Sequence, residues 1–266
     1  MKLKRKRRAV VVLMVMMALM LITSVVLALP GIDNFDVNSL PVLTRKQANI
    51  GTPVSNFVTA PGLLLGDERD VQLDLLVAPN NFFSSQSGVF GSLLALNNAT
   101  NYESVLTIQW DGIDGSMALK TDGLGTQNLN VHGNAIWIRV LNDDNPIPVR
   151  FDVYSDAGAN SGSQTIILPG GINNTPTDIA FPFTSFSGSI NFSSVSAIVM
   201  TVGGLGYPSV DLDITAVQVS TGVPTAVTFQ DISTSTESTP AIFAVVVALV
   251  AVLTGVGVFI GRKQQN

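Results

Sequence analysis

The feature that most constrains the fold of this chain is a two-residue alternation of apolar and polar side chains in its middle part. In the segment 71–75, Val, Leu and Leu alternate with Gln and Asp, and the segments 106–110, 149–154 and 211–214 repeat the pattern. Successive side chains of a β-strand point to opposite faces, so this pattern predicts half-buried strands. Turn clusters rich in Gly, Asn, Asp and Pro separate the strands, and together they predict an all-β fold, an antiparallel sandwich or barrel.

Eleven segments of this region satisfy the strand pattern. Between them lie turn clusters such as APNN, WDGIDG, LNDDNP, SDAGANSG and LPGGINN. No segment shows a helical stripe of apolar residues. The expected strands are Ile32–Asp36, Val54–Thr59, Asp70–Val77, Gly88–Leu96, Ser104–Trp110, Asn130–Val140, Val149–Tyr154, Gln164–Leu168, Asp178–Pro182, Ser196–Val202 and Val210–Ser220.

The N-terminal end has the composition of a secretory signal. Six basic residues lie within the first eight, and an apolar run extends from Ala9 to Ile22. The small residues that follow predict cleavage after Ala28, with residues 1–28 as the signal peptide and a mature chain from Leu29. The apolar stretch is long for a signal, so an uncleaved signal anchor is the alternative.

The C-terminal end predicts a membrane helix. The 21 residues from Ala241 to Gly261 carry no charge, and as a helix they would span roughly 31 Å, close to the thickness of a bilayer core. Residues 240–261 are the expected transmembrane helix, and the basic tail 262–266 stays on the cytoplasmic side. The Ser/Thr-rich segment 221–239 is the expected stalk, which leaves 29–220 as a β-sandwich ectodomain on the outer side of a cell membrane.

The charge of the chain is strongly segregated. Eight of its 14 basic residues lie at the two ends, whereas all 19 acidic residues lie between Pro30 and Thr239. With six basic residues there, that part has a net charge of −13. This charge argues against a nucleic-acid partner, which needs a basic surface, and favours attraction of cations. The chain has no cysteine, which excludes disulfides, thiolate nucleophiles and Cys-ligated zinc.

The order of segments resembles a known family. The domain opens with IDNFD, continues through DIAFPFTSFSG and NFSSVSAIVMTVGG, and closes with DLDITAVQVS. This order resembles the galactose-binding-like jelly rolls found among carbohydrate-binding modules. The segment LLLGDERDVQLDLL is similar to a segment of uncharacterised bacterial surface proteins with C-terminal anchors. Neither LPxTG nor Pro-Glu-Pro precedes the apolar run, so the resemblance does not extend to a sorting signal.

The resemblance implies a structural calcium ion that links the two ends of the jelly roll. Asp33 or Asp36 at the opening and Asp211 or Asp213 at the close are the expected ligands, because calcium takes carboxylate and carbonyl oxygens. The WDGIDG and LNDDNP loops are alternative places for the ion. Solvated surface aspartates without an ion are the competing interpretation.

Glycan binding by such a module would use exposed aromatic side chains. Trp110 shares a face with apolar neighbours and is expected in the core, whereas Tyr154 opposes the apolar face of its strand. Tyr154 and Tyr207 are therefore the candidate ligand-binding residues.

Catalytic motifs are weak in this sequence. His132 is the only histidine and is placed on an expected strand, no G-x-S-x-G is present, and the Asp pairs 111/114 and 143/144 lie in turn-like loops. The main hypothesis is therefore a non-catalytic, membrane-anchored surface protein for structural or adhesive contact with another surface protein. A membrane-tethered carbohydrate-binding module is the alternative, and a hydrolase is a third.

Overall fold

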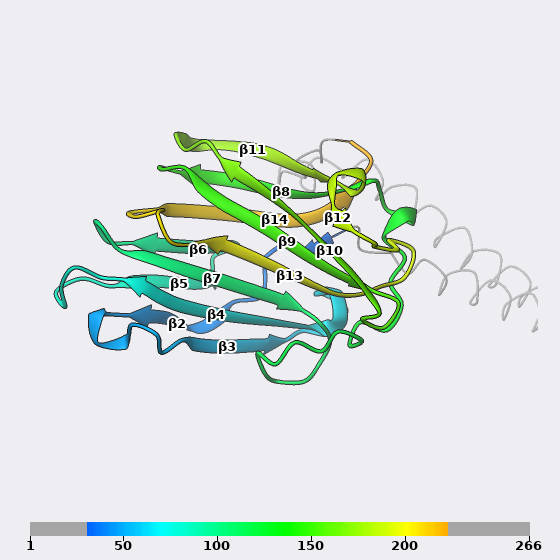
Figure 1. The fold of residues 1–266 in the computed structure, drawn as a ribbon, viewed down its shortest axis with the longest axis horizontal. Helices are drawn as coiled ribbons and strands as arrows, with labels where there is room; N and C mark the ends of the chain where they lie inside the picture. Colours follow the sequence, from blue (N-terminus) through cyan, green and yellow to red (C-terminus); the bar gives the residue numbers. More distant parts are fainter. Residues whose placement is uncertain (1–30, 223–266) are drawn as a thin grey trace, which may run out of the picture. The chain divides into compact units, whose positions relative to one another are not determined.

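The computed structural model describes residues 31–222, which form a sandwich of two antiparallel β-sheets (Figure 1). Within this range no helix has the length and apolar character needed to cross a membrane. The predicted signal peptide, the transmembrane helix, the cytoplasmic tail and nearly all of the stalk lie outside the described residues.

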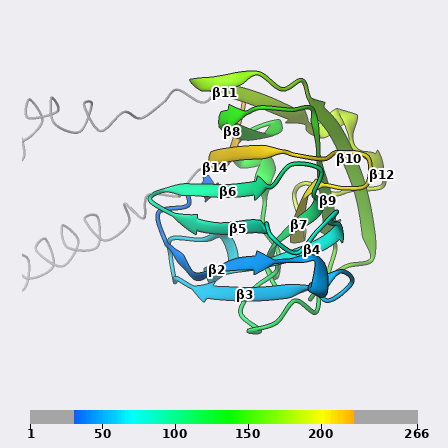
Figure 2. The same cartoon turned by 90° about the vertical axis from the view of Figure 1, so that its left-hand side faces the viewer.

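One sheet, named here the β14 sheet, has the strand order β11-β8-β14-β6-β5-β2, with β1 paired beside β14. Figure 2 shows its strands stacked from β11 to β2. Its strands are β1 (Gly31–Asp33), β2 (Ser39–Arg45), β5 (Ser85–Phe90), β6 (Leu93–Asn98), β8 (Ala135–Asp143), β11 (Ile172–Pro182) and β14 (Asp211–Ser220).

The other sheet, the β9 sheet, has the order β12-β10-β9-β13-β7-β4-β3. Its strands are β3 (Val54–Thr59), β4 (Glu68–Val77), β7 (Glu103–Trp110), β9 (Ile147–Ser155), β10 (Asn160–Leu168), β12 (Ser187–Gly188) and β13 (Val195–Gly203). Short 3-10 turns connect some of the strands: η1 (Gln47–Asn49), η2 (Leu65–Asp67), η3 (Leu129–Val131) and η4 (Phe183–Ser185).

The core lies between the two sheets and follows the alternation seen in the sequence. In β9, Val149, Phe151 and Val153 are fully buried, while the residues between them face outward. Trp110 is also fully buried, as its apolar neighbours predict. Because each sheet contributes every second residue, the polar residues of the β9 sheet lie together on its outer face.

Several expected strands differ from the observed ones. Gly88–Leu96 is a hairpin of β5 and β6, because Gly91 and Ser92 both adopt positive φ and reverse the chain inside an apolar run. The opening strand ends at Asp33. The expected strand Asn130–Val140 begins only at Ala135, since η3 precedes it.

His132 follows η3 and does not lie on a strand as predicted. The strand β2 was missed, as was the two-residue β12. Val54–Thr59 is confirmed with its expected bounds, the other expected strands are confirmed with shifted ends, and the predicted sandwich is confirmed.

Candidate metal centre and ligand-binding face

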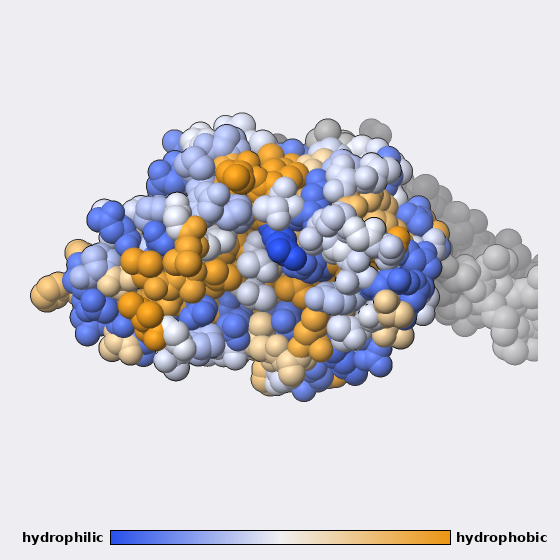
Figure 3. Space-filling view, in the orientation of Figure 1, coloured by the Kyte–Doolittle hydropathy of each residue, from blue (hydrophilic) through white to orange (hydrophobic). Residues whose placement is uncertain are grey.

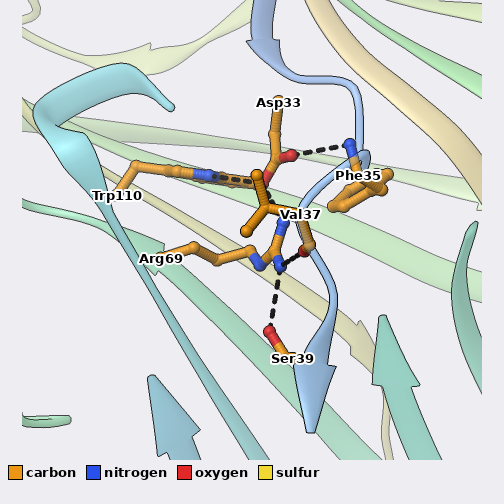
Figure 4. A network of polar contacts seen from close by, with 6 residues as sticks. All are labelled: Asp33, Phe35, Val37, Ser39, Arg69 and Trp110. Atoms are coloured by element: carbon orange, nitrogen blue, oxygen red, sulfur yellow. Dashed lines mark hydrogen bonds and ion pairs between the residues drawn. The ribbon is translucent and has the colours of Figure 1, made fainter. Parts of the chain in front are cut away.

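The strand β4 turns two neighbouring charged residues to opposite faces of its sheet. Arg69 points into the core, where its Nη1 donates to the Asp33 carboxylate at 2.8 Å and its Nη2 donates to Ser39 Oγ at 2.9 Å. The Asp33 carboxylate also accepts from Trp110 Nε1 at 3.1 Å and from the Phe35 N–H at 2.7 Å (Figure 4). Both charged side chains are at most 1% exposed, so this is a buried ion pair.

This network decides the role of Asp33. Burial raises the pKa of Asp33, and the charge of Arg69 together with the hydrogen bonds acts against that rise. The positive charge that the carboxylate needs is therefore supplied by the protein itself. The prediction of Asp33 as a calcium ligand loses its physical reason, since a second cation would be repelled by Arg69.

On the opposite face of β4, Asp70 is 1% exposed although it points away from the core. The register of the β4–β7 pair places Gln109 directly across from it. The segment 111–124 follows β7, and its Leu124 hydrogen bonds through the backbone to Ser196 of β13. The burial of Asp70 on an outer face is therefore a consequence of this loop.

Four oxygen atoms around Asp70 are buried without a hydrogen-bond donor: both carboxylate oxygens of Asp70, Oδ1 of Asp111 and Oε1 of Gln109. None of the three ion pairs formed within residues 31–222 involves these side chains. Buried oxygens without a partner are rare in folded proteins and call for an explanation.

Two further carboxylates complete this group. One oxygen from each of Glu68, Asp70 and Asp114 lies within 4.8 Å of the others. Glu68 is held in place because its Oε1 accepts from the backbone N–H groups of Asp114 and Gly115, at 2.9 and 2.7 Å. The name Asp70 cluster is used below for Glu68, Asp70, Gln109, Asp111 and Asp114.

The electrostatics of the Asp70 cluster are dominated by negative charge. Burial, together with the negative charges of Glu68, Asp111 and Asp114, raises the pKa of Asp70 to about 8. Burial also raises the pKa of Asp111, although the backbone N–H of Lys120 stabilises its carboxylate. In the absence of a cation, Asp70 therefore carries a proton near neutral pH.

The loop over the Asp70 cluster is built for close backbone contact. Gly112 has φ of 88°, and a Cβ there would lie 2.3 Å from the carbonyl oxygen of Gly123. A Cβ on Gly123 would in turn meet the carbonyl oxygen of Asp111 at 1.5 Å. Only glycine fits at these two positions, so the close contact between the backbone at 111–112 and at Gly123 requires both glycines.

A second group of polar side chains lies on the outer face of the same sheet. Arg150, Asp152 and Tyr154 alternate with core residues in β9, and the Arg150 guanidinium binds the Asp152 carboxylate at 2.6 Å. Neighbouring strands add hydroxyl groups, because Ser161 pairs with Tyr154 and Thr201 with Arg150. The outer face of β9 and its two neighbouring strands therefore offers hydrogen-bond donors, hydrogen-bond acceptors and one phenol ring.

The remaining predicted residues lie apart from one another. Asp36 accepts a hydrogen bond from Ser92 Oγ. The strands β1 and β14 pair, so the two ends of the fold lie near each other as expected, but Asp33 lies opposite Val217, and the carboxylates of Asp211 and Asp213 are farther along β14. The structure therefore does not bring the four predicted calcium ligands together.

Asp211 and Asp213 have other neighbours. The backbone N–H of Asp211 donates to Asp144, and Asn142 Nδ2 donates to Asp213 at 2.7 Å. Tyr207 lies in the loop after β13, whereas Tyr154 pairs with Ala197 near the opposite end of that strand. The two candidate tyrosines therefore do not share one site.

The loops at one end of the sandwich expose apolar side chains. Phe82 and Phe83 in the β4–β5 loop are 87% and 60% exposed, and Leu205 in the β13–β14 loop is 70% exposed. This end lies on the left in Figure 1, and hydrophobic residues gather towards it in Figure 3. The first and last strands pair at the other end, where Gly31 lies opposite Gln218.

The sequence interpretation missed Glu68, Asp70 and Gln109 as members of a site. It treated Asp111 and Asp114 as turn residues, although it named their WDGIDG loop as a place for an ion. The acidic spacing in GDERD and WDGIDG was a visible signal. Its meaning depends on β4 and β7 being neighbours, which the strand pattern alone does not show.

Comparison with known proteins gives structural matches only. No protein-family model matches the chain, and the search of curated proteins finds no relative. Among solved structures, the chain is similar to a family 11 carbohydrate-binding module of the cellulosomal cellulase Lic26A-Cel5E of Clostridium thermocellum. The identity is 11%, the TM-score is 0.34, and the match covers 74% of this chain and 96% of that one.

Two other similar structures are a binding module with a bound oligosaccharide and an enzyme. A family 61 carbohydrate-binding module solved with β-1,4-galactotriose is 12% identical with a TM-score of 0.28, over 72% of this chain and 94% of that one. An agarase is 11% identical with a TM-score of 0.34, over 53% of this chain and 22% of the enzyme. Values this low describe a β-sandwich likeness alone, and this chain's ligand has to be judged from its own residues.

Proposed function

We propose that this chain is a non-catalytic glycan-binding module of the galactose-binding-like jelly-roll type, displayed outside the membrane by its C-terminal segment. The observation that carries the proposal is the row of Arg150, Asp152 and Tyr154 on the outer face of strand β9, inside the sheet. A sugar presents hydroxyl groups that both donate and accept, together with apolar C–H faces. The row supplies a donor, an acceptor and an aromatic ring for these groups.

The geometry of the row suits an extended ligand. Successive outward residues of a strand are about 7 Å apart, so the row covers a length on the scale of two to three sugar rings. The Arg150–Asp152 pair keeps both side chains in a fixed position, because the guanidinium contacts both carboxylate oxygens. Preorganised polar groups of this kind reduce the entropic cost of binding.

A glycan array with the full-length chain in detergent tests the proposal, with Tyr154→Ala and Arg150→Met as variants. Glycan binding that weakens at least about tenfold in each variant, roughly 1.4 kcal/mol, supports it. Tyr207→Ala is the matched control, because Tyr207 lies at the other end of the sheet and should leave binding unchanged. An array on which the wild type binds no glycan would contradict the proposal.

The membrane location belongs to the same proposal and rests on the sequence of the ends. Deletion of 241–266 is expected to release the protein from membranes in soluble form, since no other segment of the mature chain is long enough to span. N-terminal sequencing of the extracted protein should begin at Leu29. If the first residue is Met1 instead, the signal is not cleaved, and the protein has a membrane anchor at each end.

A second candidate function is adhesive contact with another surface protein through the apolar loops. Phe82 and Phe83 are the most exposed aromatic residues of the described chain, and aromatic residues dominate the energetics of protein contacts. Phe82→Ser with Phe83→Ser should abolish cell–cell adhesion and leave glycan binding unchanged. If the double variant keeps cell–cell adhesion and loses glycan binding, this candidate is rejected.

A further inference from the structure

We propose that the Asp70 cluster binds one divalent cation, Ca²⁺, and that the bound ion holds the 111–124 loop against the outer face of the β9 sheet. This site shares no residue with the Arg150–Tyr154 row, and the strand β13 lies between β9 and the strands β7 and β4 that carry Gln109 and Asp70. It also differs from the site expected at the two ends of the fold.

The buried carboxylate of Asp70 points most directly to a ligand. It is 1% exposed, both of its oxygens lack a donor, and neighbouring carboxylates surround it. An anionic side chain in this position is unstable unless a proton or a cation neutralises it. A proton shared by Asp70 and Asp111 supplies only one hydrogen bond among these oxygens, whereas a cation contacts several of them at once.

The oxygen atoms available match the needs of calcium. Asp70 offers two, and Asp111 Oδ1 and Gln109 Oε1 offer one each, all buried and without donors. Asp114 and Glu68 add carboxylate oxygens from the loop and from β4. Six to eight oxygen ligands in an irregular arrangement are typical of Ca²⁺, whereas Mg²⁺ requires a strict octahedron.

The chemistry of the donors excludes softer metals as the preferred occupant. The chain has no cysteine, and every donor atom in the cluster is oxygen. Copper and zinc prefer sulfur and imidazole ligands, while oxygen-only sites select hard cations. Zn²⁺ therefore serves as the negative probe in the test.

Binding of the ion should restrain the 111–124 loop, and this restraint can be measured by proteolysis. Asp111 and Asp114 both belong to it, and the backbone N–H of Lys120 donates to Asp111 Oδ2 at 2.8 Å. An ion that contacts these carboxylates also restrains the backbone around Lys120. Lys120 is exposed and is the only basic residue in the loop, so trypsin cleavage after it reports whether the loop is held.

The test is calcium titration calorimetry together with limited trypsin digestion of the full-length chain in detergent, after removal of metal with a chelator. The expected result is one Ca²⁺ per chain, with a dissociation constant on the order of 10⁻⁵–10⁻³ M. Calcium should also slow cleavage after Lys120 at least about tenfold relative to chelator. Equal amounts of Mg²⁺ or Zn²⁺ should give little protection.

Three variants locate the ion. Asp70→Asn should abolish both calcium binding and protection, and it should still fold because the amide keeps the size of the side chain and needs neither a proton nor an ion. Asp114→Ala, at an exposed position, should weaken binding at least about tenfold. Asp122→Asn is the control, because it removes an exposed carboxylate of the same loop outside the cluster.

Two results would overturn the proposal. Wild-type protein that binds no calcium would mean that Asp70 and Asp111 share a proton instead. Calcium binding of normal affinity in Asp70→Asn would place the ion elsewhere. Because glycan binding is measured separately, failure of this site and failure of the glycan proposal give different results.

Discussion

Two buried carboxylates, Asp33 and Asp70, show how one strand produces two different electrostatic environments. Asp33 is balanced by Arg69, which is its partner at 2.8 Å, and by two further donors. Asp70 follows Arg69 in sequence but points to the other face, where carboxylates and an amide oxygen surround it. A buried charge is stable where its counter-charge is part of the chain, and elsewhere the counter-charge has to come from solution.

The largest expected effect comes from removing Arg69, the counter-charge of the buried Asp33 carboxylate. Arg69→Met keeps the volume of the side chain but leaves Asp33 buried without a cation, at an expected cost of about 3–5 kcal/mol in the free energy of unfolding. Urea unfolding followed by circular dichroism measures this. Arg139→Met is the control, since its partner Asp178 is 11% exposed and water replaces part of the lost interaction. Equal losses in the two variants would mean that burial of the Asp33 pair has no special importance.

A smaller change in the free energy of unfolding, of opposite sign, is expected when Asp70 is replaced. In chelator, Asp70→Asn should raise the free energy of unfolding by about 1–3 kcal/mol, because the folded wild type has to hold a proton on a buried carboxyl group and the amide needs none. In calcium the same variant should be less stable than wild type, since it loses the stabilisation from the ion. Unfolding curves in chelator and in calcium measure the sign of the difference in free energy of unfolding between Asp70→Asn and wild type. A variant that is less stable in both buffers would contradict this interpretation.

The pH dependence sharpens the comparison. The pKa of Asp70 is raised from 3.8 to about 8, so the folded protein holds a proton that the unfolded chain releases. Without metal, stability is therefore greatest below about pH 4 for this group and falls as the pH rises towards 8. The slope for one group is at most about 1.4 kcal/mol per pH unit. Unfolding of the chelated protein should show this fall, and Asp70→Asn should flatten it.

The smallest effect is expected at the exposed pair on β9. Arg150 is half exposed, so Arg150→Met should change the free energy of unfolding by about 1 kcal/mol or less. Its glycan binding should nevertheless weaken at least about tenfold. A large loss of stability in this variant would assign the Arg150–Asp152 pair a structural role in place of a binding role.

The sequence predicted the fold where alternation was regular and failed where local geometry was decisive. Val54–Thr59 was placed at its observed bounds because a single half-buried strand has a clear two-residue period. The turn at Gly91 and Ser92 was hidden within an apolar run that looks like one strand. The strand β2 contains Pro41, which is disfavoured inside sheets and tolerated at an edge, where β2 lies.

The candidate site was less predictable because it depends on which strands are neighbours. The alternation in β4 places Arg69 on the same face as Val71, so a charged residue on the core face was visible in the sequence. That its partner would be Asp33 was not, since the two are separated by 36 positions. The proximity of Glu68 and Asp114 likewise follows only from the β4–β7 pairing.

The most direct test of the account is the change in melting temperature on adding calcium to the chelated full-length protein, followed by circular dichroism. Wild type and Asp178→Asn, which removes a carboxylate from the other sheet, should both gain roughly 5–10 °C at a calcium concentration of about a hundred times the dissociation constant. Asp70→Asn should gain nothing. Equal gains in all three proteins, or no gain in wild type, would contradict the claim that Asp70 takes its counter-charge from solution.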